Sequence, residues 1–237
     1  MTYPQAIATT WTLAVALGSL AFCEAMPAHA QSGPFLDLAG GASQFLITAT
    51  DGDYLQRGLP HDIDTRSLAY RVGVGYAFND RWAARVSGFS LGNITQSARF
   101  VADADYNPKT GQCTANCANA APYRMTDAYR GVELVVSRSF RLSEAWTVQA
   151  SLGGAYLDHR FTINKNAGTN DESHRNRGQF VATVVGAGVG YRWLFTEISY
   201  YHGLGGSNGF LGQDQAWPLS KEIIVAWVGV KVPFPAW

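Results

Sequence analysis

The chain has 237 residues, of which 47% are hydrophobic, 13% aromatic and only 15% charged. Soluble domains carry about 25% charged residues, so much of this surface is predicted not to meet water, and the aromatic content excludes a disordered chain. The 18 basic and 18 acidic residues balance, which excludes a basic surface of the kind that binds nucleic acid.

The first thirty residues are predicted to be a cleaved export signal. An apolar core at 11–22 precedes Ala28-His29-Ala30, and small residues on either side of a larger one are typical of a signal-peptidase site. Cleavage after Ala30 leaves a single domain, 31–237. The segment 1–30 contains no Lys or Arg, so the true start codon stays open. A lipoprotein signal ending at Cys23 and a structural helix are the alternatives.

The mature chain alternates in hydrophobicity with a period of two. In 67–78 every even-numbered residue is apolar, whereas the odd-numbered ones are glycine, alanine, serine and Arg71. Such a second face suits a narrow interior better than water, which favours a transmembrane barrel with an apolar outside. The same pattern predicts eight strands, each long enough to cross a bilayer at a tilt, near 35–48, 67–78, 82–101, 126–140, 146–162, 178–193, 194–203 and 222–234.

Short and long connections are predicted to alternate along the chain. The short ones are 79–81, 141–145 and a turn near Leu194; the long ones are about 49–66, 102–125, 163–177 and 204–221. Bacterial outer-membrane barrels have short periplasmic turns and long external loops, and their sheets must close because lipid does not tolerate open edges. The predicted fold is therefore an all-β, eight-stranded antiparallel up-and-down transmembrane β-barrel. A soluble lipocalin-like barrel, which need not segregate its loops, is the alternative.

Aromatic residues gather beside the short connections and at the C-terminal end. Rings in this position are typical of the girdle at a membrane–water interface. The predicted interfacial aromatics are Phe78, Trp82, Phe140, Trp146, Trp193, Phe195 and Phe234.

Three segments carry a family resemblance: 72–78 (VGVGYAF), 185–193 (VGAGVGYRW) and 227–234 (WVGVKVPF). They resemble the small outer-membrane barrel superfamily that includes the OmpA transmembrane domain, the OmpX/Ail surface proteins and the opacity-type proteins. The resemblance implies a C-terminal insertion signal that the barrel-assembly machinery reads, with either Phe234 or Trp237 as its operative end. Its motifs specify architecture and not activity.

Strand alternation projects seven charged residues into the lumen. Because a lone buried charge is costly, these groups are expected to pair. The favoured interpretation is a salt-bridged plug that fixes strand register and blocks the pore, and the alternative is a gated small channel in which the pairs rearrange. The predicted lumen charges are Asp37, Arg71, Arg85, Glu133, Arg192, Glu197 and Lys231.

Cys113 and Cys117 are the two cysteines that remain after the signal is removed. In an exported protein such a pair predicts a disulfide. A metal site or free thiols are the alternatives, but a metal would need further Cys or His at ligand spacing nearby. No metal and no cofactor are expected.

Three residues near the C-terminus are weak catalytic candidates: His202, Ser207 and Glu222. Some eight-stranded outer-membrane barrels are lipid A deacylases with a His/Ser/Glu triad, in which His and Ser lie two apart on one strand face. Here they lie five apart across glycines, so a common face is not assured. A polar loop base is the favoured interpretation, and no enzymatic activity is predicted.

The predicted function is structural and interaction-based, as an integral protein of the Gram-negative outer membrane that presents four long loops at the cell surface. The expected partners are outer-membrane lipid and lipopolysaccharide, whose phosphates basic loop residues such as Arg175 and Arg177 would contact, the barrel-assembly machinery during insertion, and an unidentified extracellular ligand. A small-solute porin or channel is the second hypothesis, and a lipid A-modifying hydrolase is the third.

Overall fold

The structure is a computed structural model that describes residues 32–46, 62–100, 106–107, 112–113, 121–167, 170–204 and 220–234. No helix in these ranges is long and apolar enough to cross a membrane. The strands are β1 (Gly33–Leu46), β2 (Asp62–Asp64), β3 (Arg66–Ala77), β4 (Trp82–Phe100), β5 (Tyr106–Asn107), β6 (Gln112–Cys113), β7 (Ala121–Arg141), β8 (Trp146–Ala167), β9 (Asn170–Tyr191), β10 (Leu194–Leu204) and β11 (Glu222–Pro233).

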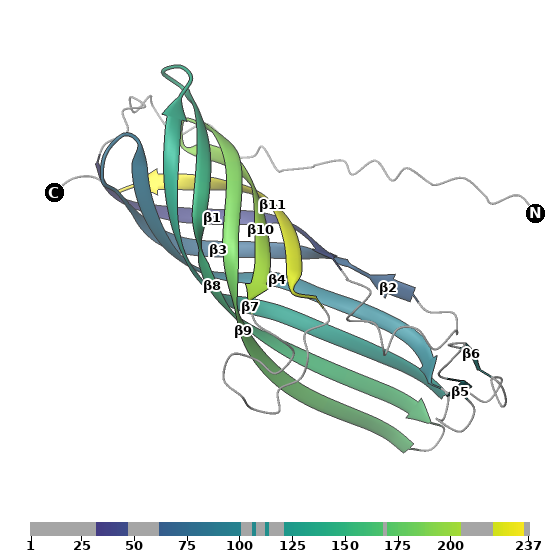
Figure 1. Ribbon diagram of the computed structural model, residues 1–237. Helices are drawn as coiled ribbons and strands as arrows, with labels where there is room; N and C mark the ends of the chain where they lie inside the picture. Colours follow the sequence, from purple (N-terminus) through teal and green to yellow (C-terminus); the bar gives the residue numbers. More distant parts are fainter. Residues whose placement is uncertain are drawn as a thin grey trace, which may run out of the picture.

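Eight of the strands close into an antiparallel barrel (Figure 1). The order β1-β3-β4-β7-β8-β9-β10-β11 follows the chain, each strand pairs with the next, and β11 returns to pair with β1. The short β2 adds to β4, and β5 and β6 form a small separate hairpin. The eight-stranded up-and-down barrel is thus confirmed.

Strand alternation decides which side chains fill the barrel and which cover it. In β10 the odd-numbered residues Phe195, Glu197 and Tyr201 are buried, whereas the even-numbered Leu194 and Ile198 are exposed. Large apolar side chains also cover the outside of the other strands; examples are Leu68, Val74, Val86, Val132, Leu134, Leu152, Val185 and Val228. A soluble protein rarely exposes so large an apolar surface. The inverted distribution is that of a membrane-spanning barrel.

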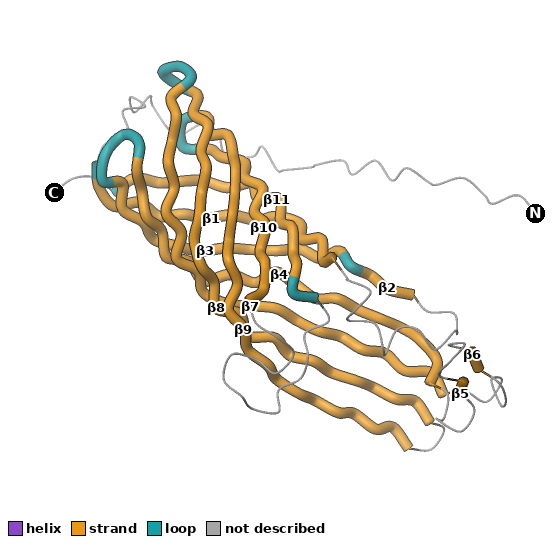
Figure 2. Tube along the Cα trace, in the orientation of Figure 1, coloured by secondary structure: helices purple, strands orange, loops and turns teal. Residues whose placement is uncertain are grey.

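Three tight turns lie together at one end of the barrel (Figure 2). At the β3–β4 turn, Asn79 Oδ1 accepts the backbone N–H groups of Arg81 and Trp82, at 2.9 Å each. At the β7–β8 turn, Ser143 Oγ accepts the N–H of Trp146 at 3.2 Å. Side chains of Asn and Ser imitate a backbone turn in this way, which explains how the chain reverses within a few residues.

At the opposite end, four strands continue well beyond the others (Figure 1). β7, β8 and β9 have 21, 22 and 22 residues, about twice the 9 to 11 that cross a bilayer. β8 and β9 stay paired up to Ala167 and Asn170. The predicted long loop at 163–177 is therefore wrong, because the strands run through most of it. The sequence of 163–177 is polar apart from Ile163, Ala167 and Gly168, so hydrophobic alternation gives no signal there although the pairing continues.

A β-bulge in β4 reverses the alternation partway along that strand. The register of β4 on β7 shifts between Ser90 and Gly92, and Gly92 has a φ of 80°. A Cβ at Gly92 would collide with the side chain of Ser67, so this position requires glycine. Before the bulge the odd-numbered Phe89 points inward, and after it the even-numbered Ile94 does.

Candidate functional site

Five of the predicted lumen charges form one buried cluster, the interior ion network: Asp37, Arg71, Arg85, Glu133 and Glu197. Arg71 lies 3.1 Å from Asp37 (Nε–Oδ1), 3.3 Å from Glu197 (Nη2–Oε2) and 3.7 Å from Glu133 (Nη1–Oε1). Arg85 lies 3.2 Å from Asp37 (Nη1–Oδ2), 3.0 Å from Glu133 (Nη2–Oε1) and 3.5 Å from Glu197 (Nη1–Oε2). Each guanidinium group therefore contacts all three carboxylates.

Polar side chains from neighbouring strands bind the remaining oxygens of the network. Tyr201 Oη donates to Glu133 Oε2 at 2.8 Å, and Ser199 Oγ donates to Glu197 Oε1 at 2.8 Å. Gln149 binds two partners: its Nε2 donates to Glu197 Oε2 at 3.2 Å, and its Oε1 accepts from Lys231 Nζ at 2.7 Å. The network together with Lys231 holds three basic and three acidic groups, and neutrality with good hydrogen bonding is what lets such groups stay buried.

Aromatic rings line the same part of the interior. The guanidinium carbon of Arg71 lies 4.8 Å from the ring centroid of Trp227 and 5.6 Å from that of Phe195, and Lys231 Nζ lies 5.2 Å from the Phe195 ring. These are cation–π distances. Phe195, predicted as an interfacial aromatic, is buried in the lumen.

Arg192, predicted as a lumen charge, is also placed differently. It lies in the β9–β10 turn with a φ of 55°, and its exposed side chain stands 5.6 Å from the ring of Tyr191. The turn at Arg192 and Trp193 ends the alternation of β9, which is why Arg192 does not follow it into the lumen. Phe195 is predicted at the interface because it lies beside this turn, but it shares the inward face of β10 with Glu197. Leu194 then points outward and Phe195 inward. The other predicted interfacial aromatics are exposed on the outer surface: Phe78, Trp82, Phe140, Trp146, Trp193 and Phe234.

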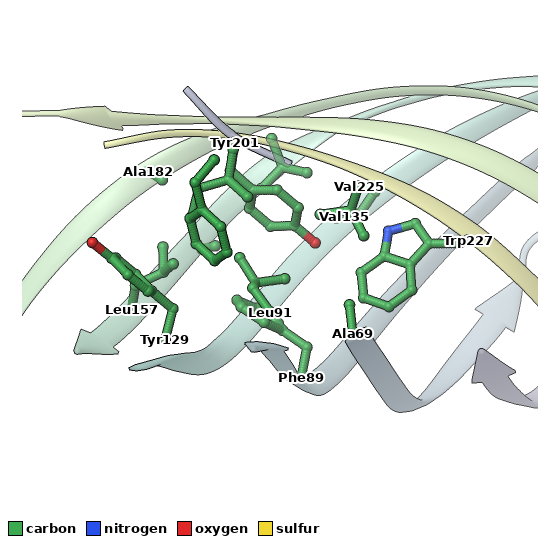
Figure 3. Packing of buried hydrophobic residues seen from close by; sticks show 14 of the residues in the cluster. Ala69, Phe89, Leu91, Tyr129, Val135, Leu157, Ala182, Tyr201, Val225 and Trp227 are labelled. Atoms are coloured by element: carbon green, nitrogen blue, oxygen red, sulfur yellow. The ribbon is translucent and has the colours of Figure 1, made fainter. Parts of the chain in front are cut away.

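An apolar layer fills the lumen on the side of the network toward the long strands (Figure 3). The ring centroids of Phe89 and Tyr201 are 5.5 Å apart, and those of Phe45 and Tyr129 are 5.1 Å apart. Leu91, from the bulge of β4, is fully buried among them. Beside the ion network remains a cavity of about 10 Å³, lined in part by Arg85, Gln149 and Lys231. A cavity of that size holds about one water molecule.

A second buried polar group lies at the far side of the apolar layer. His159 Nδ1 lies 2.9 Å from Asp127 Oδ1, and Tyr129 Oη donates to Asp127 Oδ2 at 2.6 Å. The backbone N–H of Ser220 donates to Tyr129 Oη at 2.9 Å, which ties the start of β11 to β7. Sequence reasoning missed this group. In β7 the odd-numbered side chains point into the lumen, so the alternation that predicts Glu133 there also predicts Asp127.

Two of the three weak catalytic candidates, His202 and Glu222, are neighbours in the structure. His202 and Glu222 lie on the outer wall, half-exposed, with 3.4 Å between Nδ1 and Oε1. Ser207 lies outside the described residues, as do the signal segment 1–30, Cys117 of the predicted Cys113–Cys117 disulfide, and Trp237. Nowhere in the described ranges do three or more His, Cys, Asp or Glu residues meet in a way that suits a metal ion.

The outer wall of β7, β8 and β9 carries a charged group above the apolar surface. Arg130 Nε donates to Asp158 Oδ2 at 2.9 Å, and Arg177 Nε donates to Asp158 Oδ1. Burial by itself would raise the pKa of Asp158, but the hydrogen bonds and positive charges of Arg177 and Arg130 outweigh it and hold the pKa below its ordinary value. Both arginine side chains are 58% exposed.

Fold and interior together define a small membrane-spanning β-barrel with a filled lumen. No family model and no curated protein matches the chain. Among solved structures, it is similar to Ail of Yersinia pestis in complex with the heparin analogue sucrose octasulfate (12% identity, 85% of this chain and 99% of that chain, TM-score 0.38). It is also similar to the N-terminal β-barrel domain of OprF (13%, 86% and 100%, 0.39) and to the outer membrane protein OprG (12%, 88% and 100%, 0.42), both from Pseudomonas aeruginosa.

At these identities and TM-scores the likeness adds nothing to the assignment of the barrel. That assignment rests on the closed strand pairing and on the outward apolar surface. Ail is among the proteins that the sequence resemblance names.

Proposed function

We propose that the chain is an integral β-barrel of a Gram-negative outer membrane with a structural and surface-interaction role and a lumen that does not conduct. The filled interior carries this proposal. The ion network and the apolar layer lie in series, and the cavity beside the network has only about 10 Å³. A solute would have to break several buried ion pairs and displace packed aromatic rings in order to pass.

The orientation follows from the two unlike ends of the barrel. Barrels of this kind keep short turns on the periplasmic side, which supports a periplasmic position for the three tight turns and an extracellular position for the long ends of β4, β7, β8 and β9. The first and last strands also meet at the turn end, where Phe234 N–H donates to Pro34 O at 3.0 Å. Loops and extended strands then face the outer leaflet, its lipopolysaccharide and an extracellular ligand, and the C-terminal strand is available to the barrel-assembly machinery.

Conductance in a planar bilayer tests the proposal. Residues 31–237, refolded in detergent, are first compared unboiled and boiled on an SDS gel, because a folded barrel migrates differently from the unfolded chain. We expect the shifted, folded protein to give no current steps above the bilayer background. Sustained steps from folded protein would overturn the closed lumen and establish the small-solute channel instead.

The proposal includes no enzymatic activity. Mass spectra of lipid A incubated with the folded protein, and with a His202→Ala variant, are expected to be identical to those of untreated lipid A. Loss of an acyl chain with the unaltered protein but not with the variant would establish the hydrolase.

A further inference from the structure

An apolar recess opens on the outer wall, between β4, β7, β8 and β9. Its volume is about 290 Å³. The outward-facing Gly154 lines it, and the outward-facing Gly88 is paired with the lining residue Val132. A Cβ at Gly88 would have no atom within 4 Å, and one at Gly154 would reach only the carbonyl oxygen of Ala182, at 3.8 Å. The side chains around these gaps are apolar: Val86, Val132, Leu134, Tyr156 and Val181.

Charged side chains stand directly beyond this recess on the same face. Arg130 follows Val132 toward the long end of β7, Asp158 follows Tyr156 on β8, and the register pairs Arg130 with Asp158. One step further, Arg160 is paired with Arg177. Beyond the recess, the described outward-facing charges on β7, β8 and β9 are mostly arginines. They are Asp158 and the outer-wall arginines Arg124, Arg130, Arg160, Arg175 and Arg177.

Asp158 holds two of these arginines side by side. Both contact it through Nε, and within the described part of the chain their terminal nitrogens have no other partner. A guanidinium group whose outer edge is unpaired is well suited to bind phosphate through two parallel hydrogen bonds. The fixed pair therefore offers a prearranged phosphate site at the boundary between the apolar surface and water.

We propose that the recess and the outer-wall arginines form one binding site for lipid A, the phosphorylated acyl-glycolipid of the outer leaflet. This inference rests on the proposed outer-membrane location and orientation. One acyl chain lies in the recess between Val86 and Tyr156, and a phosphate binds between Arg130 and Arg177. The arginines lie on three neighbouring strands. Because neighbouring strands are about 4.8 Å apart, the arginines cover roughly 10 Å across the sheet. That spread fits a lipid with two separated phosphates better than a phospholipid with one.

Binding of defined lipids to the refolded mature chain tests the site. The protein in detergent micelles is titrated with bisphosphorylated lipid A, monophosphoryl lipid A and phosphatidylglycerol, and the bound fraction is read by native mass spectrometry. We expect the bisphosphorylated form to bind tightest. An Arg130→Gln, Arg177→Gln double variant is expected to weaken its binding by about tenfold or more, because two charge-assisted contacts are lost.

Two further variants separate the two halves of the site. Gly154→Leu fills the recess without touching an arginine and is expected to weaken lipid A binding while leaving the salt dependence unchanged. Arg138→Gln is the matched control, since Arg138 is an exposed arginine on β7 at the turn end, where it contacts the rings of Trp82 and Phe140. Its removal is expected to leave lipid A affinity unaltered.

Several outcomes would overturn the inference. Equal affinity of the folded double variant and the unaltered protein would show that the arginines do not bind the phosphates. Equal binding of phosphatidylglycerol and lipid A would replace the site by a general attraction to anionic lipid. The gel shift and the conductance measurement report on the barrel and its closed lumen independently, so failure of the lipid site is distinguishable from failure of the proposed function.

Discussion

The barrel contains two groups of arginines that differ in nearly every physical respect. In the interior, Arg71 and Arg85 are buried, and each contacts three carboxylates. On the outer wall, Arg130 and Arg177 share one carboxylate, that of Asp158, and both arginines are largely exposed. The direction in which a residue points from its strand decides between these environments. The comparison teaches that an arginine whose charge is neutralised by carboxylates helps to close the lumen. An arginine on a face with more arginines than carboxylates is available to a ligand.

The two groups should also differ in what they contribute to stability. Removing one partner from a buried ion pair leaves an uncompensated charge and costs about 3–5 kcal/mol. An exposed ion pair contributes about 0–1 kcal/mol, because water screens it and long side chains lose freedom in making it. Stability is therefore expected to depend on the interior arginines, and binding on the outer ones.

The largest effect is expected for Arg71→Met. The substitution leaves three carboxylates with Arg85 as the remaining arginine in contact, so the free energy of unfolding should fall by about 3–5 kcal/mol. Urea unfolding in lipid vesicles, followed by tryptophan fluorescence, measures the change. Arg130→Met on the outer wall is the matched control and should lose no more than about 1 kcal/mol. Equal losses for the two variants would remove the distinction between the two groups.

A smaller effect is expected for Tyr201→Phe. The variant keeps the aromatic ring against Phe89 but removes the hydroxyl that donates to Glu133 at 2.8 Å. Hydrogen bonds to charged groups contribute about 1.5–3 kcal/mol, and the free energy of unfolding should fall by that amount in the same urea assay. Tyr156→Phe is the control, since Tyr156 points outward. A loss below about 0.5 kcal/mol, the size of an ordinary surface substitution, would show that the arginines alone satisfy Glu133.

Sequence pattern predicts the middle of each strand far better than its ends. Where a strand crosses the apolar region, alternation is strong, and it projects Asp37, Arg71 and Glu133 into the interior, where the structure has them. The sequence of 163–177 is polar apart from Ile163, Ala167 and Gly168, so the pattern carries no signal there, and the extension of β8 and β9 through most of this segment is missed. Backbone pairing, which needs no hydrophobic residue, holds those segments together.

Local features of the turns and bulges account for the other errors. The β9–β10 turn ends the alternation of β9, which is why Arg192 is predicted on the wrong side. Phe195 is predicted at the interface from its position beside that turn, although it shares the inward face of β10 with Glu197. The bulge at Gly92 shifts the alternation within β4, where Ile94 and Gln96 point inward. Neither break has a hydrophobic signature, because each depends on one residue with a positive φ. The group of Arg130, Asp158 and Arg177 on the outer wall is not predicted from the sequence for another reason. Its three residues come from three strands, and only the strand register brings them together.

The smallest expected effect concerns the acid dependence of the outer group. Asp158 has a pKa below its ordinary value of 3.8 because Arg130 and Arg177 favour its charged form. A group whose pKa is lower in the folded than in the unfolded state stabilises the fold above the unfolded value, and the contribution is lost as pH falls through the folded value. The difference in unfolding free energy between the unaltered protein and Asp158→Asn should thus be constant from pH 7 to 5 and shrink below about 3.8, from at most about 1 kcal/mol. Urea unfolding at several pH values measures it. A difference that grows on acidification would mean that the arginines do not stabilise the carboxylate, and that Asp158 does not hold the two guanidinium groups that the lipid site requires.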